Sequence, residues 1–134
     1  MTWQFSMRVY YEDTDFGGIV YYANYLKFIE RARSEWIRNL GIDQRDLKTN
    51  GNTVFAVRHL EAHYLTPAKF DDVLEIATVL EKKTVARLIL KQDVFRDKEL
   101  LFSARVTLVA LTQNRKPTRL PAEIRFLVLQ PTVR

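Results

Sequence analysis

The strongest helix signal of the chain lies in residues 20–40, which read VYYANYLKFIERARSEWIRNL. Apolar residues recur there at spacings of three and four, the pattern of a helix that buries one face. Gly41 follows the last of them, where a residue with left-handed backbone often ends a helix. We therefore predict a helix from Val20 to Leu40, with a wide apolar stripe that needs a large partner surface. The stripe consists of Tyr22, Tyr25, Leu26, Ile29, Ala32, Trp36, Ile37 and Leu40.

Strand patterns surround this helix. Residues 5–11 alternate apolar and polar side chains, which is typical of a strand with one buried face. Residues 53–65, 73–81, 87–95 and 101–111 are rich in β-branched, leucine and aromatic residues, residues 96–99 suit a hairpin turn, and residues 124–129 could add a last strand. One long helix followed by several long strands predicts an α+β fold in which an antiparallel sheet wraps a helix.

Length and composition limit the possible classes of protein. The chain has 134 residues, of which 47% are hydrophobic and 28% charged, so we expect one globular domain over residues 1–134 rather than a disordered chain. It has no cysteine, which excludes a disulfide, a thiolate zinc site and a cysteine nucleophile. No apolar run is long enough for a membrane span, and the first residues do not resemble a signal peptide, so we expect a cytoplasmic protein.

The positive charge of the chain is concentrated near its C-terminal end. The net charge is +5, and residues 91–134 hold nine basic and four acidic side chains. Arg115, Lys116 and Arg119 form the densest group. Such a group is either a solvated basic surface or a site for phosphate groups or nucleic acid. We favour the solvated surface and expect no nucleic-acid partner, because acidic and basic residues balance over the rest of the chain.

The sequence of residues 10–26, YYEDTDFGGIVYYANYL, and of residues 28–33, FIERAR, resembles the hotdog-fold acyl-CoA thioesterases. It is similar to the Tol-Pal-associated (YbgC-type) branch and to the hydroxybenzoyl-CoA branch, and the likeness continues through YLTPA at 64–68 and DDVLEI at 71–76. The resemblance implies a curved antiparallel sheet wrapped around a long central helix, assembled as homodimers or homotetramers. It also implies hydrolysis of an acyl-CoA to a free acid and coenzyme A, without a cofactor or metal.

The family's catalytic aspartate matches Asp15, and its carbonyl-polarising backbone N–H matches that of Tyr22. Cleaving a thioester with water needs a carboxylate, as base or nucleophile, and donors for the developing oxyanion. Asp15 precedes Gly17 and Gly18, which let the backbone approach a ligand closely, and the expected helix start offers free N–H groups. The N–H of Gly18 or of Tyr21 is a candidate second donor beside that of Tyr22. The alternative role for Asp15 is to cap the helix. The sequence leaves open whether Asp15 acts as nucleophile or as general base.

Tyr22 is a departure from one branch of the family. Many members of the Tol-Pal-associated branch carry a histidine at this place, whereas the hydroxybenzoyl-CoA branch carries a tyrosine. The backbone donor does not depend on the side chain, so hydrolysis remains possible while a histidine-assisted mechanism does not. A hotdog dehydratase, which usually uses a histidine near the helix, is also disfavoured. The remaining alternative is a non-catalytic hotdog module that binds an acyl carrier protein or an envelope-complex protein.

The phosphates of coenzyme A require lysine or arginine. Our first candidates are Lys82, Lys83 and Arg87, which flank a turn between two strands. The group of Arg115, Lys116 and Arg119 is the second choice, and either set could be solvated surface. Tyr25 and Phe28 could wall the acyl pocket or simply pack in the core.

Four other candidates are weaker. His59, Glu61 and His63 alternate on one strand, but we expect a mixed strand face or subunit interface rather than a metal site. Glu30 and Glu35 lie on the predicted helix, where another hotdog branch places its carboxylate. We expect them to form ion pairs with Arg33 and Arg31. Asp13 is the weaker acid candidate. Ser34 has no histidine near it in sequence to form a triad.

Overall fold

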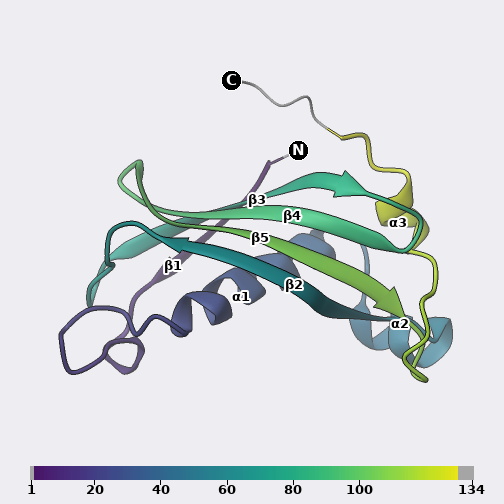
Figure 1. Ribbon diagram of the computed structural model, residues 1–134, viewed down its shortest axis with the longest axis horizontal. Coiled ribbons are helices and arrows are strands. Elements are labelled where there is room, and N and C mark those ends of the chain that lie inside the picture. The colour runs from purple at the N-terminus through teal and green to yellow at the C-terminus, as the bar shows by residue number, and fades with distance from the viewer. Residues whose placement is uncertain (1, 130–134) are drawn as a thin grey trace.

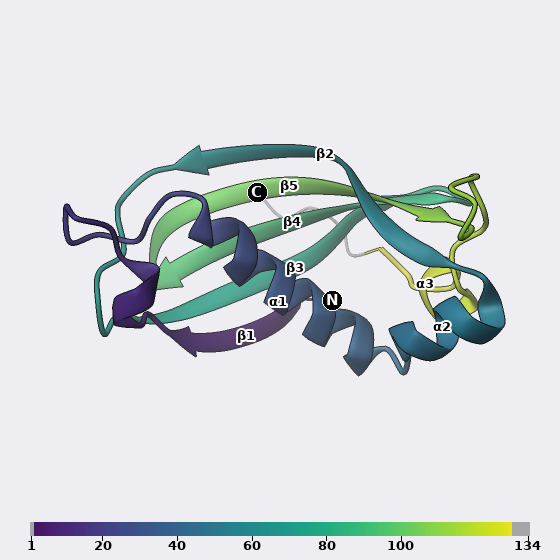
Figure 2. The ribbon, with the colours of Figure 1, turned by 90° about the horizontal axis from the view of Figure 1, so that it is seen from below.

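The computed structural model describes residues 2–129, in which a five-stranded antiparallel sheet curves over one long helix (Figures 1 and 2). The strand order is β1-β3-β4-β5-β2, so β1 and β2 are the two edges. The strands are β1 (Thr2–Arg8), β2 (Val54–Tyr64), β3 (Val73–Lys83), β4 (Arg87–Arg96) and β5 (Glu99–Leu111). The helices are α1 (Asn24–Asn39), α2 (Gln44–Gly51) and the short α3 (Ala122–Arg125). No helix in residues 2–129 is long and apolar enough to span a membrane.

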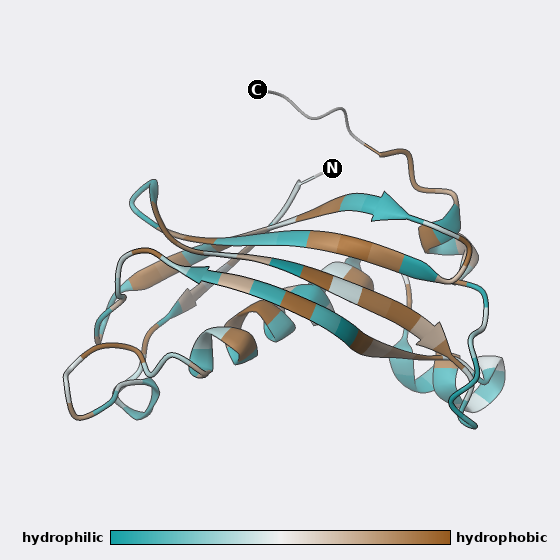
Figure 3. Cartoon of the chain, in the orientation of Figure 1, coloured by the Kyte–Doolittle hydropathy of each residue, from teal (hydrophilic) through white to brown (hydrophobic). Residues whose placement is uncertain are grey.

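Helix α1 lies across one face of the sheet and buries its apolar stripe there (Figure 2). Hydrophobic stretches lie along the strands and along α1 (Figure 3), and every second residue over most of β3 and β4 is buried, so these central strands turn one side toward the core. The buried helix residues are Tyr25, Phe28, Ile29, Ala32, Trp36 and Ile37. This arrangement confirms the predicted α+β hotdog fold, with a curved antiparallel sheet wrapped around a long helix.

A buried polar network fixes α1 on the sheet. Gln92 of β4 is fully buried, and its side-chain nitrogen donates to the Ile29 carbonyl at 2.9 Å and to Thr78 Oγ1 at 3.0 Å. Arg33 of α1 donates to the Gln92 side-chain oxygen at 3.1 Å, and burial lowers the pKa of its guanidinium. Buried polar groups that lose such partners are costly, so this network strongly favours one position of the helix along the sheet.

The predicted start of the helix at Val20 is wrong. Residue 20 instead forms an extended bridge with Thr14, and its N–H donates to the Ala68 carbonyl at 2.9 Å. These bonds hold the chain in an extended form, so α1 begins only at Asn24. Within the predicted stripe, Tyr22 and Leu26 are exposed, because Tyr22 precedes the helix, and Phe28 is buried instead. The end is as predicted, because Leu40 caps the helix and Gly41 follows with a φ of +89°.

The four strands predicted after the helix are confirmed to within about two residues. The 96–99 turn is also confirmed, with Asp97 and Lys98 both in the left-handed region. The first strand runs from Thr2 to Arg8 rather than over residues 5–11, because the chain turns at Tyr11–Asp13. The strand expected at 124–129 is wrong, since residues 122–125 form the helix α3. The sequence patterns also do not predict α2, whose first turn Asp43 caps by accepting from the N–H groups of residues 45 and 46.

Candidate active site

Asp15 lies in a tight hairpin that projects beyond the end of the sheet before α1 begins (Figure 1). Thr14 and Val20 bridge across the hairpin, and the Asp15 N–H donates to the Ile19 carbonyl at 2.9 Å. The Gly18 N–H donates to the Asp15 carbonyl at 3.0 Å, and Gly18 has a φ of +83°. Most side chains are strained at that φ, so glycine fits the turn that presents Asp15.

The Asp15 side chain is exposed and held by its own loop. One carboxylate oxygen, Oδ1, accepts a hydrogen bond from the Gly17 N–H at 2.8 Å. The helix-capping alternative is not supported, because Ala23 is the N-cap residue of α1 and no side chain caps that end. The carboxylate is therefore oriented by one donor and open to an incoming molecule, as a base or nucleophile requires.

The backbone around Tyr22 is held by hydrogen bonds on both sides. The Tyr21 N–H and the Asn24 side chain both donate to the Asp13 carbonyl, each at 2.9 Å. The Asn24 N–H donates to the Tyr21 carbonyl at 2.8 Å. Within residues 2–129, the N–H groups of Tyr22 and Ala23 donate to no hydrogen-bond acceptor. Tyr22 lies just before α1 and not in its first turn, which corrects the expected position but leaves its N–H as a free donor.

An aromatic cluster packs behind Tyr22. Tyr25 stacks on Phe102 with ring centroids 4.9 Å apart, and its hydroxyl accepts a hydrogen bond from the Ala68 N–H at 3.0 Å. Burial raises the pKa of Tyr25 above its ordinary value. Tyr64, at the end of β2, makes edge contacts with the rings of Tyr22, Tyr25 and Phe102.

Tyr25 is a core residue that also reaches a small cavity. It is 3% exposed, yet it lines an apolar cavity of about 280 Å³ together with Ile19, Tyr22, Tyr64 and Pro67. Ile19 belongs to the hairpin that carries Asp15, so the cavity adjoins the candidate catalytic loop. Both predicted roles of Tyr25, packing and lining a pocket, are thus compatible with its position, whereas Phe28 is fully buried in the core.

The first set of basic candidates lies at the other end of the sheet. Arg87 pairs with Val109 on β5, whereas the Asp15 end of the sheet adjoins Leu101, so about 26 Å of strand separates the two ends. Lys82 and Arg87 are exposed at this end. Lys83 is engaged elsewhere, since its ammonium donates to the carbonyls of Ile124, Arg125 and Leu127 at the end of α3. That contact makes Lys83 a structural residue in this fold and a poor phosphate ligand.

The second basic set is spread along the chain after β5. Arg115 has a φ of +65° in the turn, and its N–H donates to the Thr112 carbonyl at 2.8 Å. Lys116 and Arg119 follow this turn, and Lys116 is exposed. This set does not adjoin the Asp15 hairpin either.

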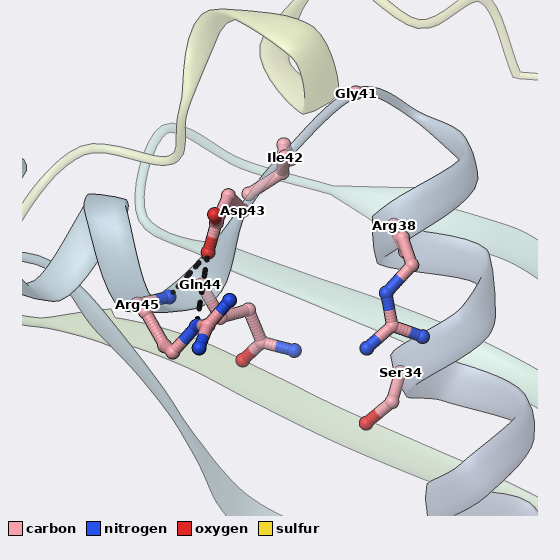
Figure 4. A pocket seen from close by; sticks show the side chains of 7 residues that line it. All are labelled: Ser34, Arg38, Gly41, Ile42, Asp43, Gln44 and Arg45. Atoms are coloured by element: carbon pink, nitrogen blue, oxygen red, sulfur yellow. Dashed lines mark hydrogen bonds and ion pairs between the residues drawn. The ribbon is translucent and has the colours of Figure 1, made fainter.

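A cavity of about 500 Å³ lies between the end of α1 and the start of α2 (Figure 4). Arg38 and Arg45 line it, but each already pairs with an acid, Arg38 with Glu35 at 2.5 Å and Arg45 with Asp43 at 3.9 Å. The partners differ from those predicted, because Glu35 pairs with Arg38 rather than Arg31. Glu30 accepts a hydrogen bond from Ser34 at 2.6 Å. These helix carboxylates are engaged on the surface, as expected for structural residues.

The alternating residues of β2 show no metal geometry. Glu61 and His63 form a pair at 3.1 Å, and the hydrogen bond from His63 lowers the pKa of Glu61. In the part of the chain that the structure describes, no group of three or more histidine, aspartate or glutamate residues could hold one metal ion. Asp13 is also engaged, since its carboxylate accepts from the Tyr10 N–H at 2.8 Å.

Two residues of this site received no role from sequence reasoning. Tyr64 is 42 positions from Tyr22 and donates its hydroxyl proton to the Tyr22 carbonyl at 3.0 Å. Asn24 fixes the Asp13 carbonyl from the first turn of α1. Neither contact has a local sequence pattern, although both residues lie in the segments that carry the family resemblance. Only the pairing of β2 with β5 and the loop that follows brings Tyr64 to Tyr22.

Comparison with known proteins agrees with this geometry. The family model of the thioesterase-like superfamily matches residues 9–126. The acyl-CoA thioesterase YbgC of Haemophilus influenzae is 38% identical over 122 residues, 90% of each chain. A probable thioesterase from Bartonella henselae is 36% identical with a TM-score of 0.87, over 90% of this chain and 100% of that one. A 4-hydroxybenzoyl-CoA thioesterase variant solved with 4-hydroxybenzoyl-CoA shares the fold, at a TM-score of 0.87 and 21% identity over 92% and 96% of the two chains.

Proposed function

The chain belongs to the thioesterase-like superfamily, and we infer from this that it is an acyl-CoA thioesterase, which cleaves an acyl-CoA with water into a free acid and coenzyme A. The observation that best supports this reaction is that one short segment carries both the exposed Asp15 carboxylate and the free N–H of Tyr22. The bonds to the Asp13 carbonyl hold these two parts together. Nothing in the fold favours the alternative of a non-catalytic binding module.

We propose that the Tyr22 N–H donates to the thioester carbonyl oxygen as negative charge develops there, with the Ala23 N–H beside it. A free backbone donor held by its neighbours needs little rearrangement in the transition state. The N–H groups of Gly17 and Gly18 are bonded to Asp15, so these glycines shape the loop rather than bind the oxyanion. Tyr25 supports the wall of the adjoining cavity.

Asp15 can act in two ways. As a nucleophile, its carboxylate attacks the thioester carbon, the C–S bond breaks, and coenzyme A leaves as a thiolate that takes a proton from water. A second water then hydrolyses the resulting mixed anhydride. As a general base, Asp15 removes a proton from water, whose oxygen attacks the same carbon; the C–S bond then breaks, and the coenzyme A thiolate takes the proton from Asp15. A single turnover in ¹⁸O-water tests the first route: label in the Asp15 carboxylate would show that water attacked an anhydride at that carbon, whereas label in the product acid alone is compatible with both routes.

We propose that two or more copies of the chain assemble, as a homodimer or homotetramer. β2 is an edge strand of 11 residues with exposed Val57 and Leu60, and an unpaired edge of this kind tends to pair with another chain. Phe16, at the hairpin tip, is fully exposed and offers further apolar surface. Light scattering that shows a 15.8 kDa particle at micromolar concentration would contradict this proposal.

Assembly bears on how coenzyme A binds. Lys82 and Arg87 stay candidates for its phosphates, and because they lie far from Asp15 on one chain, a second protomer would have to supply them. Exposed Arg58 lies beside Arg87 on the wall of a cavity of about 280 Å³ and joins the candidates. An acyl carrier protein as an alternative donor of the acyl group, a single-domain organisation and a cytoplasmic location remain predictions.

The function is tested by measuring thiol release from acyl-CoAs with short, long and aromatic acyl groups. We expect turnover of at least one class, with saturation in the micromolar to millimolar range. The acyl group with the highest kcat/KM would also decide between aliphatic and aromatic preference. If purified, assembled protein released no thiol above the uncatalysed rate from any member, the proposed function would be wrong.

A further inference from the structure

The carbonyl of Tyr22 is held by a side chain from a distant strand. The Tyr64 hydroxyl donates to this carbonyl oxygen at 3.0 Å. The carbonyl lies on the side of Tyr22 that leads into α1, whereas the free N–H lies on the side that comes from the Asp15 hairpin. The Tyr22 carbonyl and the Ala23 N–H belong to one planar trans peptide unit, so the bond from Tyr64 fixes the direction of the Ala23 N–H. The Tyr22 N–H belongs to the preceding unit, whose Tyr21 carbonyl accepts from the Asn24 N–H at 2.8 Å.

Other bonds already restrain the flanking peptides. The N–H groups of Val20 and Tyr21 donate to the carbonyls of Ala68 and Asp13, and the Asn24 N–H donates to the Tyr21 carbonyl. The Tyr22 carbonyl would be the free end of this arrangement without Tyr64. Tyr64 therefore completes the set of contacts that holds the two peptide units carrying the free N–H groups of Tyr22 and Ala23.

The Tyr64 hydroxyl itself is well placed for this contact. Its ring lies with the Phe102 and Tyr25 rings at centroid distances of 5.0 and 5.6 Å, and β2 ends at this residue against β5. Partial burial, together with the neighbouring tyrosines, raises the pKa of Tyr64. The group stays a neutral O–H donor at the pH of any ordinary assay, so its contribution does not change with protonation.

We propose that Tyr64 is a positioning residue, whose hydroxyl holds the Tyr22 carbonyl and thereby aims the free Ala23 N–H, beside that of Tyr22, at the carbonyl oxygen of the substrate. The proposal rests on the proposed thioesterase function. Small errors in the placement of a catalytic group are costly, because the donor must meet the oxygen within hydrogen-bond distance. The effect should appear in the chemical step rather than in coenzyme A binding, since Tyr64 does not lie near the basic candidates.

The test is Tyr64→Phe, which keeps the ring and its packing and removes only the hydroxyl. We expect kcat to fall roughly 10- to 100-fold, somewhat less than for loss of a complete oxyanion donor, with KM changed by less than about threefold. The loss should be the same from pH 6 to pH 9, because the hydroxyl does not titrate there. Tyr10→Phe, whose exposed hydroxyl makes no hydrogen bond within residues 2–129, is the matched control and should retain the wild-type kcat.

Two non-hydrolysable ligands distinguish a misplaced backbone donor from a general loss of ligand binding. One is an acyl-CoA analogue in which CH₂ replaces sulfur, so the carbonyl remains, and the other is an S-alkyl coenzyme A without the carbonyl. Tyr64→Phe should weaken the ketone about tenfold and leave the thioether unchanged. If Tyr64→Phe lost equal affinity for both ligands, or kept the kcat of an active wild type, the positioning role would be wrong while the thioesterase function would stand. Wild-type protein that hydrolyses no acyl-CoA would overturn the proposed function, and the positioning role with it.

Discussion

The Gly17 N–H donates to Asp15 Oδ1 at 2.8 Å, and a Cβ atom at Gly17 would lie 3.2 Å from that same oxygen. The hydrogen bond therefore depends on a residue without a side chain. The loop brings the backbone so close to the carboxylate that even a methyl group must displace one or the other. This contact gives Gly17 a specific role in orienting Asp15, beyond that of a flexible turn residue.

Gly17→Ala should lower kcat about 10- to 100-fold while the protein stays folded, because the Asp15 carboxylate must shift by a few tenths of an ångström or rotate. Steady-state kinetics measure this kcat on the acyl-CoA that the wild type hydrolyses with the highest kcat/KM. The matched control is Gly51→Ala in α2, where a Cβ would also lie 3.2 Å from an atom, Leu47 Cδ1. That side chain can move, so the control should keep full activity; equal activity of the two variants would contradict the role of Gly17.

Asp15→Asn should reduce turnover at least about 100-fold, since the amide keeps the shape but cannot act as base or nucleophile. The melting temperature should stay close to that of the wild type, because the side chain is exposed. Asp97→Asn in the β4–β5 turn is the control, as asparagine tolerates the left-handed backbone there. Turnover of Asp15→Asn within tenfold of wild type would rule out Asp15 as the catalytic carboxylate.

Tyr22→Phe tests whether the side chain or the backbone of this residue takes part. Phenylalanine leaves the N–H in place, so we expect kcat within about tenfold of wild type and an effect mainly on KM. The comparison is turnover beside Asp15→Asn on the same substrate. A phenylalanine variant as inactive as the asparagine variant would show that the hydroxyl takes part in the chemistry.

The sequence predicts the fold well because the signals are local and periodic. The α1 stripe and the four strands after it could be assigned from spacing alone, and the resemblance supplied their arrangement. The start of α1 was placed four residues early, because apolar residues 20–23 continue the helical spacing while tertiary bonds to Asp13, Thr14 and Ala68 hold that segment in a different form. Tertiary contacts of this kind override local preference, and a single sequence does not show them.

The site could be predicted only where it is contiguous. Asp15 and Tyr22, the proposed catalytic residues, share one segment, and hydrogen bonds to the Asp13 carbonyl tie that segment to the start of α1. Tyr64 depends on strand pairing across 42 positions, so no spacing points to its contact with Tyr22. Lys83 shows the opposite kind of error, in which a residue predicted for the site has a structural contact instead. A lysine near a turn suggests a phosphate ligand, but the carbonyls at the end of α3 bind this ammonium, and no local pattern shows that α3 packs there.

The contact of Lys83 with α3 leads to a stability prediction. Its ammonium donates to the carbonyls of Ile124, Arg125 and Leu127 at the end of that short helix. The Ile124 carbonyl also accepts from the Leu127 N–H at 3.1 Å, whereas the other two carbonyls have no second donor among residues 2–129. Lys83→Met keeps the length and apolar stem of the side chain and removes the charge. It should lower the free energy of unfolding by about 2 kcal/mol, the usual loss for hydrogen bonds to a charged donor. Lys82→Met is the control, since Lys82 is exposed and makes no such contact in the described chain, and it should change stability by less than about 0.5 kcal/mol.

The same two variants separate structural from substrate-binding roles. If Lys83 acts only on α3, Lys83→Met should leave KM for acyl-CoA near the wild-type value at a temperature where both proteins are folded. Lys82→Met should instead raise KM severalfold, and more at low salt, if Lys82 meets a coenzyme A phosphate. Urea unfolding and kinetics at two salt concentrations give both results. A Lys83→Met protein of normal stability but raised KM would reverse the assignment, because it would mean that the ammonium leaves the α3 carbonyls to bind the phosphates.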